Sequence, residues 1–314
     1  MIWYALQRLG LALLICVLAL AILFCAVYVI PGDPASIALG PRASDAMKAA
    51  LRARMGLDQP LVLQVLYFFG NILRGDLGLD VMSNRSVATI VMEALPHTLA
   101  LALAGLGWAV VLGIPLGCLS AVRRGTLVDR LVGVVSVATI SMPSFVVAIY
   151  GLLIFAVALQ WLPAIGAGNA GDPGDQLLHL ILPAFAVGLG WVGYLARLVR
   201  ASMLEVMGEN HIRTARAFGL RERTIVYRYA LRIAILPTVT LIGIGIGSLL
   251  SSAVFAEVVF NRPGIGSLVF GAAQTRNYPV VMGAVLVTVF LFALFNLLAD
   301  LLVALLDARV RAGL

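Results

Sequence analysis

The chain has 314 residues, of which 62% are apolar and only 12% are charged, and its mean hydropathy is +1.04. A soluble domain of this length needs a far more charged surface, so the composition indicates an all-α polytopic membrane protein. The formal net charge is +7, but the basic residues lie in loops beside apolar segments without a base-reading motif, which argues against nucleic acid as a partner.

Six uncharged segments are long enough to cross a bilayer, because a spanning helix needs about 20 mostly apolar residues. They are residues 9–30, 98–121, 131–159, 176–196, 233–256 and 278–299. With the N-terminus inside, the short outer loops hold only Arg262 and Arg276, whereas the inner loops hold most of the other arginines. The sequence therefore predicts six transmembrane helices with both termini in the cytoplasm.

The chain divides into three predicted parts. Residues 1–30 hold the N-terminus and the first span, residues 31–97 form a segment outside the membrane, and residues 98–314 form the core transmembrane domain with the other five spans and a cytoplasmic loop at about residues 197–232. In the outer segment, Asp58 is expected to cap a helix with an apolar stripe that runs to Leu73. Such a helix lies on the membrane surface or packs over the spans, and contact with a receptor is the alternative.

A break in the third span is predicted at Ser141, Met142, Pro143 and Ser144, because proline removes a helical hydrogen bond and favours a kink. The kink has either a structural role or a place along a transport pathway. In the fifth span, Gly243, Gly245 and Gly247 have no βαβ unit around them, so they are expected to permit close helix packing rather than to bind a nucleotide.

The most cationic stretch is a cytoplasmic loop at residues 197–232. It carries eight arginines against three glutamates, and it is too long for a plain turn. Asn210 is suited to start a helix and Gly219 to end it in a left-handed turn. Helical spacing places four residues of this stretch on one face, namely His211, Thr214, Ala215 and Phe218. This face either docks on a protein partner or lies on anionic lipid, and the spacing leaves both open.

The run from Glu209 to Pro237 resembles the signature loop of permease subunits in binding-protein-dependent ABC importers, most closely the dipeptide, oligopeptide and nickel branch. His211 stands at the family's tyrosine, Phe218 at its lysine and Ile233 at its asparagine. The matching residues are Arg213, Thr214, Ala215, Arg216, Ala217, Gly219, Leu231, Arg232, Leu236 and Pro237. The resemblance implies that Glu209, His211 and residues 213–219 form the coupling helix, which sits in a cleft of an ATPase subunit.

Further runs resemble the same family in the same order along the chain. They include Ser-Met-Pro-Ser-Phe from Ser141 and Pro-Gly-Ile-Gly from Pro263. This chain also departs from the family's residues at Asp80 and Asn277. At Asp80 the family usually has serine, and at Asn277 it usually has aspartate. The resemblance implies that residues 141–144 lie near the central cavity, and that Pro263, Gly264 and Gly266 help to form the outer gate.

The resemblance also implies a type I ABC importer permease fold, a bacterial cytoplasmic-membrane location and transport by alternating access. The expected partners are a second, related permease, two ATPase subunits that carry ATP and Mg²⁺, a periplasmic binding protein and membrane lipid. Peptides are the expected substrate, with nickel chelates, opines, glutathione and some sugars as alternatives. No cofactor is expected on this chain, because its only lysine, Lys48, lacks the Gly-Lys-Ser/Thr context of a phosphate-binding loop.

Two other function classes fit the residues less well. An ion-driven carrier needs ionisable groups near the bilayer midplane, but the only charge in the six predicted spans and their extensions is Asp300, near an inner helix end, where pairing with a loop arginine is expected. An intramembrane enzyme needs clustered catalytic or metal-binding groups, and His97, His179 and His211 show no such spacing. The sequence therefore favours a permease that is not itself an enzyme and holds no metal.

Overall fold

The computed structural model describes residues 2–29, 43–54, 58–60, 63, 69–72 and 74–306, and these residues are almost entirely helical. The helices are α1 (Ile2–Val29), α3 (Asp45–Arg54), α5 (Val87–Val122), α6 (Leu127–Ser141), α7 (Ser144–Gly151), the π-helix η1 (Leu152–Ala158), α8 (Pro173–Met207), α9 (Asn210–Ala217), α10 (Glu222–Thr224), the π-helix η2 (Ile225–Ala230), α11 (Leu231–Ala234), α12 (Leu236–Val259), α13 (Ile265–Gln274) and α14 (Tyr278–Leu306). Within the described part, the β structure is limited to an isolated bridge between Leu79 and Ser86.

Five described helices are long and apolar enough to cross a membrane: α1, α5, α8, α12 and α14. A sixth span is formed if α6 and the α7–η1 segment are counted together. The six predicted segments therefore all correspond to helices. Two helices are longer than their apolar runs, since α5 begins at Val87 and α8 continues to Met207.

The third predicted span is broken rather than kinked. α6 and the α7–η1 segment meet at an angle of 99°. Met142 adopts an extended backbone conformation, as a residue before proline prefers, and Pro143 occupies the position that precedes α7. The prediction of a bend at this site is confirmed, but the chain changes direction too sharply for one continuous helix.

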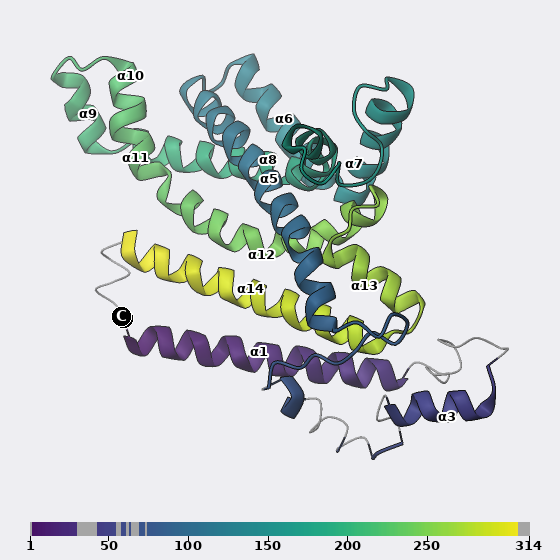
Figure 1. The fold of residues 1–314 in the computed structure, drawn as a ribbon. Helices are drawn as coiled ribbons and strands as arrows, with labels where there is room; N and C mark the ends of the chain where they lie inside the picture. The colour runs from purple at the N-terminus through teal and green to yellow at the C-terminus, as the bar shows by residue number, and fades with distance from the viewer. Residues whose placement is uncertain are drawn as a thin grey trace.

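The helices lie so that the two ends of the molecule differ. Figure 1 shows α9 and α10 on the side where α14 ends, and α3 and α13 on the opposite side. We call these the α9 side and the α13 side. The α9 side carries the predicted cytoplasmic loop, and the α13 side carries the predicted outer segments, so the arrangement agrees with the orientation drawn from the arginines.

Close contact between α5 and α8 forms the centre of the fold. An added Cβ on Gly113 would lie 2.8 Å from the Cβ of Leu195, and one on Gly117 would lie 2.8 Å from the Cβ of Val199. These two glycines are one helical turn apart, so they form a small-residue stripe that lets the two backbones approach. Larger side chains there would push the central helices apart.

The glycines of α12 also permit close packing, as predicted. An added Cβ on Gly243 would overlap Ala299 of α14, and one on Gly247 would lie 2.6 Å from the ring of Phe292. Gly245 lies against the ring of Trp191 in α8, where an added Cβ would be 3.0 Å away. α12 is therefore packed closely between α8 and α14 at residues 243–247.

One ion pair joins three helices on the α9 side. Asp129 of α6 accepts hydrogen bonds from Arg200 Nε at 2.6 Å and from an Arg200 terminal nitrogen at 2.9 Å. Ser120 of α5 donates to the same carboxylate at 2.6 Å, and the Gly125 backbone N–H donates at 2.9 Å. The sequence places Arg200 in the predicted loop at residues 197–232. In the structure it lies in α8, and its ion pair with Asp129 connects α8 to α6 and, through Ser120, to α5.

Candidate functional site

The predicted cytoplasmic loop is a compact helical hairpin formed by α9, α10, η2 and α11, which we call the basic hairpin. Its inner face packs against the end of α8. Ile212 and Ala215 of α9 are buried together with Met203, Ile225 and Val226. Because this small core contains side chains from α9, η2 and α11 of the hairpin and from α8, the hairpin is a folded extension of the spans.

The structure divides the predicted face of α9. Ala215 is buried in the hairpin's own core, whereas Phe218 is 81% exposed at the tip. Thr214 is exposed, and His211 is partly buried. The expectation that these four residues form one docking surface is therefore wrong for Ala215, because α9 turns its Ile212–Ala215 side inward.

The ends of α9 are set by backbone contacts. Gly219 has a φ of +73°, the Leu220 N–H bonds to the Ala215 carbonyl at 3.3 Å, and the Gly219 N–H bonds to the Arg216 carbonyl at 2.9 Å. This is the glycine-closed C-terminus that the sequence predicts. At the other end the capping position is Glu209, one residue before the predicted Asn210.

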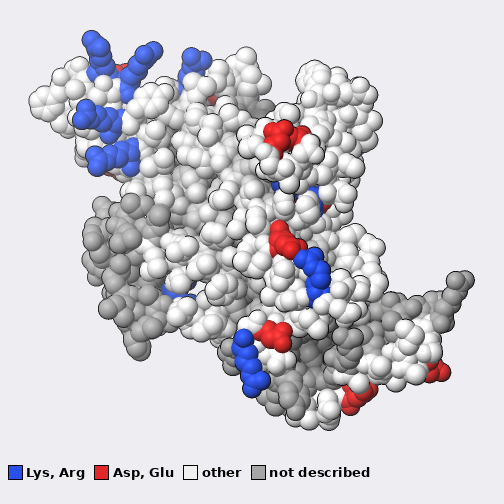
Figure 2. Space-filling view, in the orientation of Figure 1, with Lys and Arg blue, Asp and Glu red and all other residues white. Residues whose placement is uncertain are grey.

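Cationic side chains surround the tip of the hairpin. Figure 2 shows Lys and Arg gathered over the α9–α10 region at the upper left. Arg216 pairs with Glu222 at 2.8 Å, and His211 Nδ1 lies 3.0 Å from Glu209. The exposed apolar side chains of the hairpin are Phe218, Leu220, Tyr227, Tyr229 and Ile233. The exposed tip therefore combines aromatic anchors with positive charge, and Arg213 and Ala217 also lie on it.

The helix break forms a second candidate site. Ser141, Met142 and Pro143 are exposed in the isolated chain, and Ser144 is partly buried. Backbone that departs from a helix at membrane depth is tolerated only where it is buried in protein or lines a watery cavity. This surface is therefore suited to face another subunit or a pathway rather than lipid.

The predicted gate residues surround a buried carboxylate that sequence reasoning missed. Glu257 of α12 is fully buried, and it accepts hydrogen bonds from Thr98 Oγ1 at 2.6 Å and from the Gly266 N–H at 2.7 Å. The Ser267 N–H also donates to it at 3.2 Å. Thr98 in turn accepts from the Ile265 N–H at 2.8 Å. We call this arrangement of Thr98, Glu257 and the first turn of α13 the carboxylate cap.

Of the three gate candidates, Gly264 and Gly266 belong to the carboxylate cap. An added Cβ on Gly264 would overlap the Glu257 carboxylate, and one on Gly266 would lie 2.5 Å from the Val254 Cα. Pro263 precedes this close approach in the same turn. The signal that could have revealed Glu257 is a single acid near the end of an apolar run, shortly before a Pro-Gly-Ile-Gly turn.

A buried arginine stands next to the carboxylate cap. Arg262 is 4% exposed, and one terminal nitrogen donates to the His179 carbonyl of α8 at 3.4 Å. Burial lowers the pKa of Arg262, and the neighbouring Glu257 charge opposes that shift. The arginine therefore offsets the charge of the buried acid while contacting α8.

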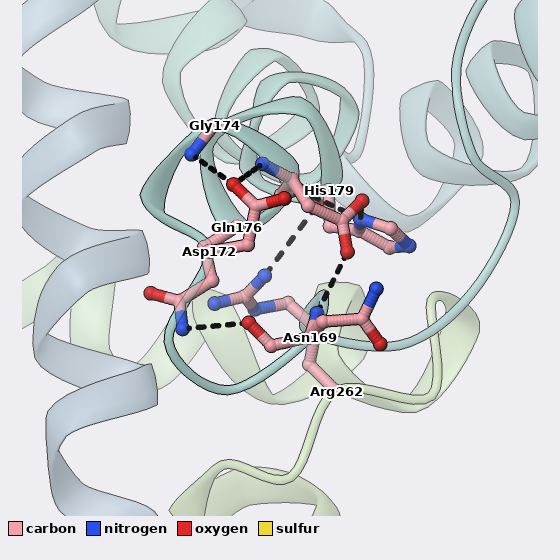
Figure 3. A network of polar contacts seen from close by, with 7 residues as sticks. Asn169, Asp172, Gly174, Gln176, His179 and Arg262 are labelled. Atoms are coloured by element: carbon pink, nitrogen blue, oxygen red, sulfur yellow. Dashed lines mark hydrogen bonds and ion pairs between the residues drawn. The ribbon is translucent and has the colours of Figure 1, made fainter.

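The loop before α8 is ordered by its acids, as Figure 3 shows. Asp172 caps α8 by accepting from the Gly174 and Asp175 N–H groups at 3.0 and 3.2 Å. Asp175 accepts from the Asn169 N–H at 2.7 Å. The Gly166 N–H donates to the Phe260 carbonyl at 2.8 Å, so this loop is attached to the turn that leads to α13.

The two departures from the family pattern meet in space. The Asn277 side-chain amide donates to the Asp80 carboxylate, which also accepts from the Met82 and Ser83 N–H groups at 3.1 and 3.0 Å. The Asp80 carboxylate therefore connects the outer segment to the start of α14.

Some predictions fall outside the described residues. The Asp300 side chain is not described, so its expected ion pair is untested, and most of the helix expected after Asp58 is also outside the described ranges. Among the described residues, no group of three or more His, Cys, Asp or Glu side chains could hold a metal ion. The structure thus brings together the hairpin residues at one end and the gate residues at the other.

Comparisons with known proteins place this arrangement in context. Residues 113–312 match the family model for the binding-protein-dependent transport system inner membrane component, and residues 1–102 match the model for its N-terminal part. A protein of Brucella suis biovar 1 that is named a peptide permease is 41% identical over 321 residues, which cover 99% of each chain.

A second relative is the glutathione transport system permease protein GsiC of Pectobacterium atrosepticum. It is 39% identical over 298 residues, which cover 95% of this chain and 94% of the relative. Among solved structures, a chain of the MetNI methionine ABC transporter in an inward-facing conformation is similar with a TM-score of 0.58 and 20% identity. The match covers 69% of this chain and 96% of that chain, and it supports the likeness of the fold alone.

Proposed function

This chain belongs to the family of inner-membrane components of binding-protein-dependent transport systems, and we propose that it imports small peptides by ATP-driven alternating access. It is a multi-pass inner-membrane protein and a permease subunit of an ABC importer. In the proposed cycle, a binding protein delivers the substrate outside, and ATP binding closes two ATPase subunits. The basic hairpin transmits that closure to the spans.

The observation that carries the proposal is the exposure of Phe218 on a folded, cationic tip. A helix bound to a membrane surface places a broad apolar face in the lipid. In α9 the apolar residues Ile212 and Ala215 are already buried in the protein, so α9 itself offers no broad apolar face, and the exposed apolar side chains of the hairpin are Phe218, Leu220, Tyr227, Tyr229 and Ile233. Phe218, which at 81% is the most exposed of these side chains, is suited to a pocket on a protein partner, so docking on the ATPase is favoured over docking on lipid.

A second subunit is supported by the helix break. Residues 141–143 are exposed in the isolated chain although they fall within a span. Contact of this surface with a second permease, or with the pathway between the two, satisfies the constraint on irregular backbone in a bilayer. We therefore propose a pair of permeases with the pathway between them, flanked on this chain by residues 141–144.

The substrate assignment rests on the relatives. One is named for peptides and another for glutathione, and glutathione is itself a tripeptide. Residues 98–122 of α5, 180–196 of α8 and 236–256 of α12 include no Asp, Glu, Lys or Arg. These three helices therefore offer no fixed charge at mid-membrane to select an anion or a cation. Small zwitterionic peptides are compatible with such a pathway, and nickel chelates and opines are the alternatives for the same machinery.

The test is co-purification from detergent-solubilised membranes with Phe218→Arg as the variant. We expect the wild-type chain to retain a P-loop ATPase and a second permease, and Phe218→Arg to lose at least ten-fold of the ATPase while it keeps the permease. The matched control is Phe270→Arg, because Phe270 is exposed on α13 at the other end of the molecule. Equal ATPase recovery with Phe218→Arg and wild type would contradict the proposed docking surface.

A further inference from the structure

The start of α13 is capped by side chains from two distant helices. The first N–H groups of any helix lack intrahelical partners and are usually bonded by the side chain at the capping position. In α13 that position is Gly264, which has no side chain. Thr98 of α5 accepts from the Ile265 N–H, and Glu257 of α12 accepts from the two N–H groups that follow.

The capping charge is enclosed. Glu257 has no exposed surface, and Thr98 is 4% exposed. Both Glu257 oxygens are bonded, one by Thr98 and the other by the α13 backbone. A buried carboxylate is costly unless it is hydrogen-bonded and charge-compensated, and the helix N-terminus and Arg262 supply that compensation. Removing one partner would therefore leave a buried charge or orphaned N–H groups.

Glu257 stands at the far end of the helix that leaves the basic hairpin. The hairpin ends in α11, and after Ile235 the chain continues as α12 from Leu236 to Val259. With a rise of about 1.5 Å per residue, a helix of this length extends roughly 36 Å. A rigid displacement of α12 at the hairpin therefore reaches Glu257, and the hydrogen bonds of the carboxylate cap pass it to α13.

We propose that Glu257 is a positioning residue for transport, because its carboxylate, held by Thr98, makes the turn at residues 260–264 and the helix α13 move with α12. Residues 260–264 connect α12 to α13 without helical structure, so the backbone alone would let α13 lag behind α12. The carboxylate cap removes that freedom. This inference rests on the proposed function, since it takes the basic hairpin as the place where the ATPase acts.

The test measures substrate transported per ATP hydrolysed. The complete transporter, with second permease, ATPases and binding protein, is placed in proteoliposomes, and radiolabelled glutathione and dialanine are the probes. We expect Glu257→Ala to lower uptake at least ten-fold while ATP hydrolysis stays within two-fold, and Thr98→Val to lower uptake less. The double variant should be no worse than Glu257→Ala, because both changes break one unit.

Thr275→Val is the matched control for Thr98→Val. Its hydroxyl bonds only to carbonyls within α13, so uptake per ATP should equal that of wild type. If Glu257→Ala fails to assemble, Thr98→Val becomes the decisive variant, because it keeps the carboxylate. The quantity measured is again the substrate transported per ATP hydrolysed. An unchanged ratio in the decisive variant overturns the inference, whereas absence of ATP-dependent uptake in the wild type would overturn the proposed function instead.

A second measurement follows the movement itself. Spin labels are placed at Gln274→Cys on α13 and Ile244→Cys on α12, both exposed positions, in a chain whose native cysteines are replaced by alanine. We expect one narrow distance population for the complete wild-type transporter and a broader one for Glu257→Ala. An equally narrow population in both would overturn the inference, because α13 would then be positioned without the carboxylate.

Discussion

At the scale of single residues, the turn before α13 owes its glycine at position 264 to a neighbouring carboxylate. Gly264 has an extended backbone with φ −98° and ψ 177°, so any residue could adopt its conformation. What excludes a side chain is space, because an added Cβ would overlap both oxygens of Glu257. The glycine is therefore required by the carboxylate cap and not by the turn.

We predict that Gly264→Ala destabilises the protein, whereas Gly271→Ala does not. The first change forces the buried carboxylate to move, and such overpacking typically costs about 1–3 kcal/mol. Gly271 lies within α13 with open space around it, where alanine gains about 0.5–1 kcal/mol over glycine. Thermal unfolding of the two variants in the same detergent checks this, and equal midpoints would show that the contact at Gly264 is tolerated.

Residue-level prediction from the sequence succeeded where the contact was local and failed where it was distant. Gly219 ends α9 as its sequence neighbours indicate, since a left-handed turn is a property of a few adjacent residues. Glu257 was missed because its partner Thr98 lies on another helix. Ala215 was assigned to the outer surface because helical spacing defines a face but not what covers it.

At the scale of elements, the outer segment is attached to α14 through Asp80. The carboxylate accepts from two backbone N–H groups and from the amide of Asn277. Burial by itself raises the pKa of Asp80, but the hydrogen bonds from Ser83, Met82 and Asn277 together outweigh it and hold the pKa below the ordinary value. The charged form of Asp80 is therefore the form that the attachment stabilises.

This contact predicts a pH dependence of stability. An acid whose pKa is lower in the folded than in the unfolded state stabilises the fold above its unfolded pKa of about 3.9, and this contribution is lost as pH falls through the folded value. We expect Asp80→Asn to lower the unfolding midpoint at pH 7 and pH 5, and the difference from wild type to shrink below pH 4.

The control for this prediction is Glu93→Gln. The ion pair of Glu93 with Arg85 is exposed on both sides, and exposed pairs contribute only about 0–1 kcal/mol. Its effect should be small at every pH. A difference between Asp80→Asn and wild type that persists undiminished at pH 3 would show that the charge of Asp80 is not what stabilises the attachment.

The sequence located the elements well but not their ends or angles. Apolar length identified all six spanning segments, because the bilayer demands it. The extension of α8 to Met207 was missed because its last turns are stabilised by packing against the basic hairpin, through Met203 and Val206, rather than by lipid. A proline indicates a bend, but the 99° angle at Pro143 depends on the packing of α7 against α8 and α12.

At the scale of the whole molecule, two dissimilar ends are joined by continuous helices. The α9 side presents exposed cationic side chains, which gather at the upper left of Figure 2, and the exposed ring of Phe218. The α13 side encloses its key charges, Glu257 and Arg262, within the fold. α12 runs from one end to the other. This layout suits a subunit that a partner displaces at the α9 side and that opens or closes the transport pathway at the α13 side.

The most direct test of this account is ATP-dependent accumulation by the complete transporter in sealed proteoliposomes, with radiolabelled glutathione and dialanine as probes. We predict that at least one probe accumulates only when ATP is present on the side of the basic hairpin and the binding protein is present on the side of α13. Accumulation driven by an imposed proton gradient in the absence of ATP would contradict the account, because the chain would then be an ion-coupled carrier.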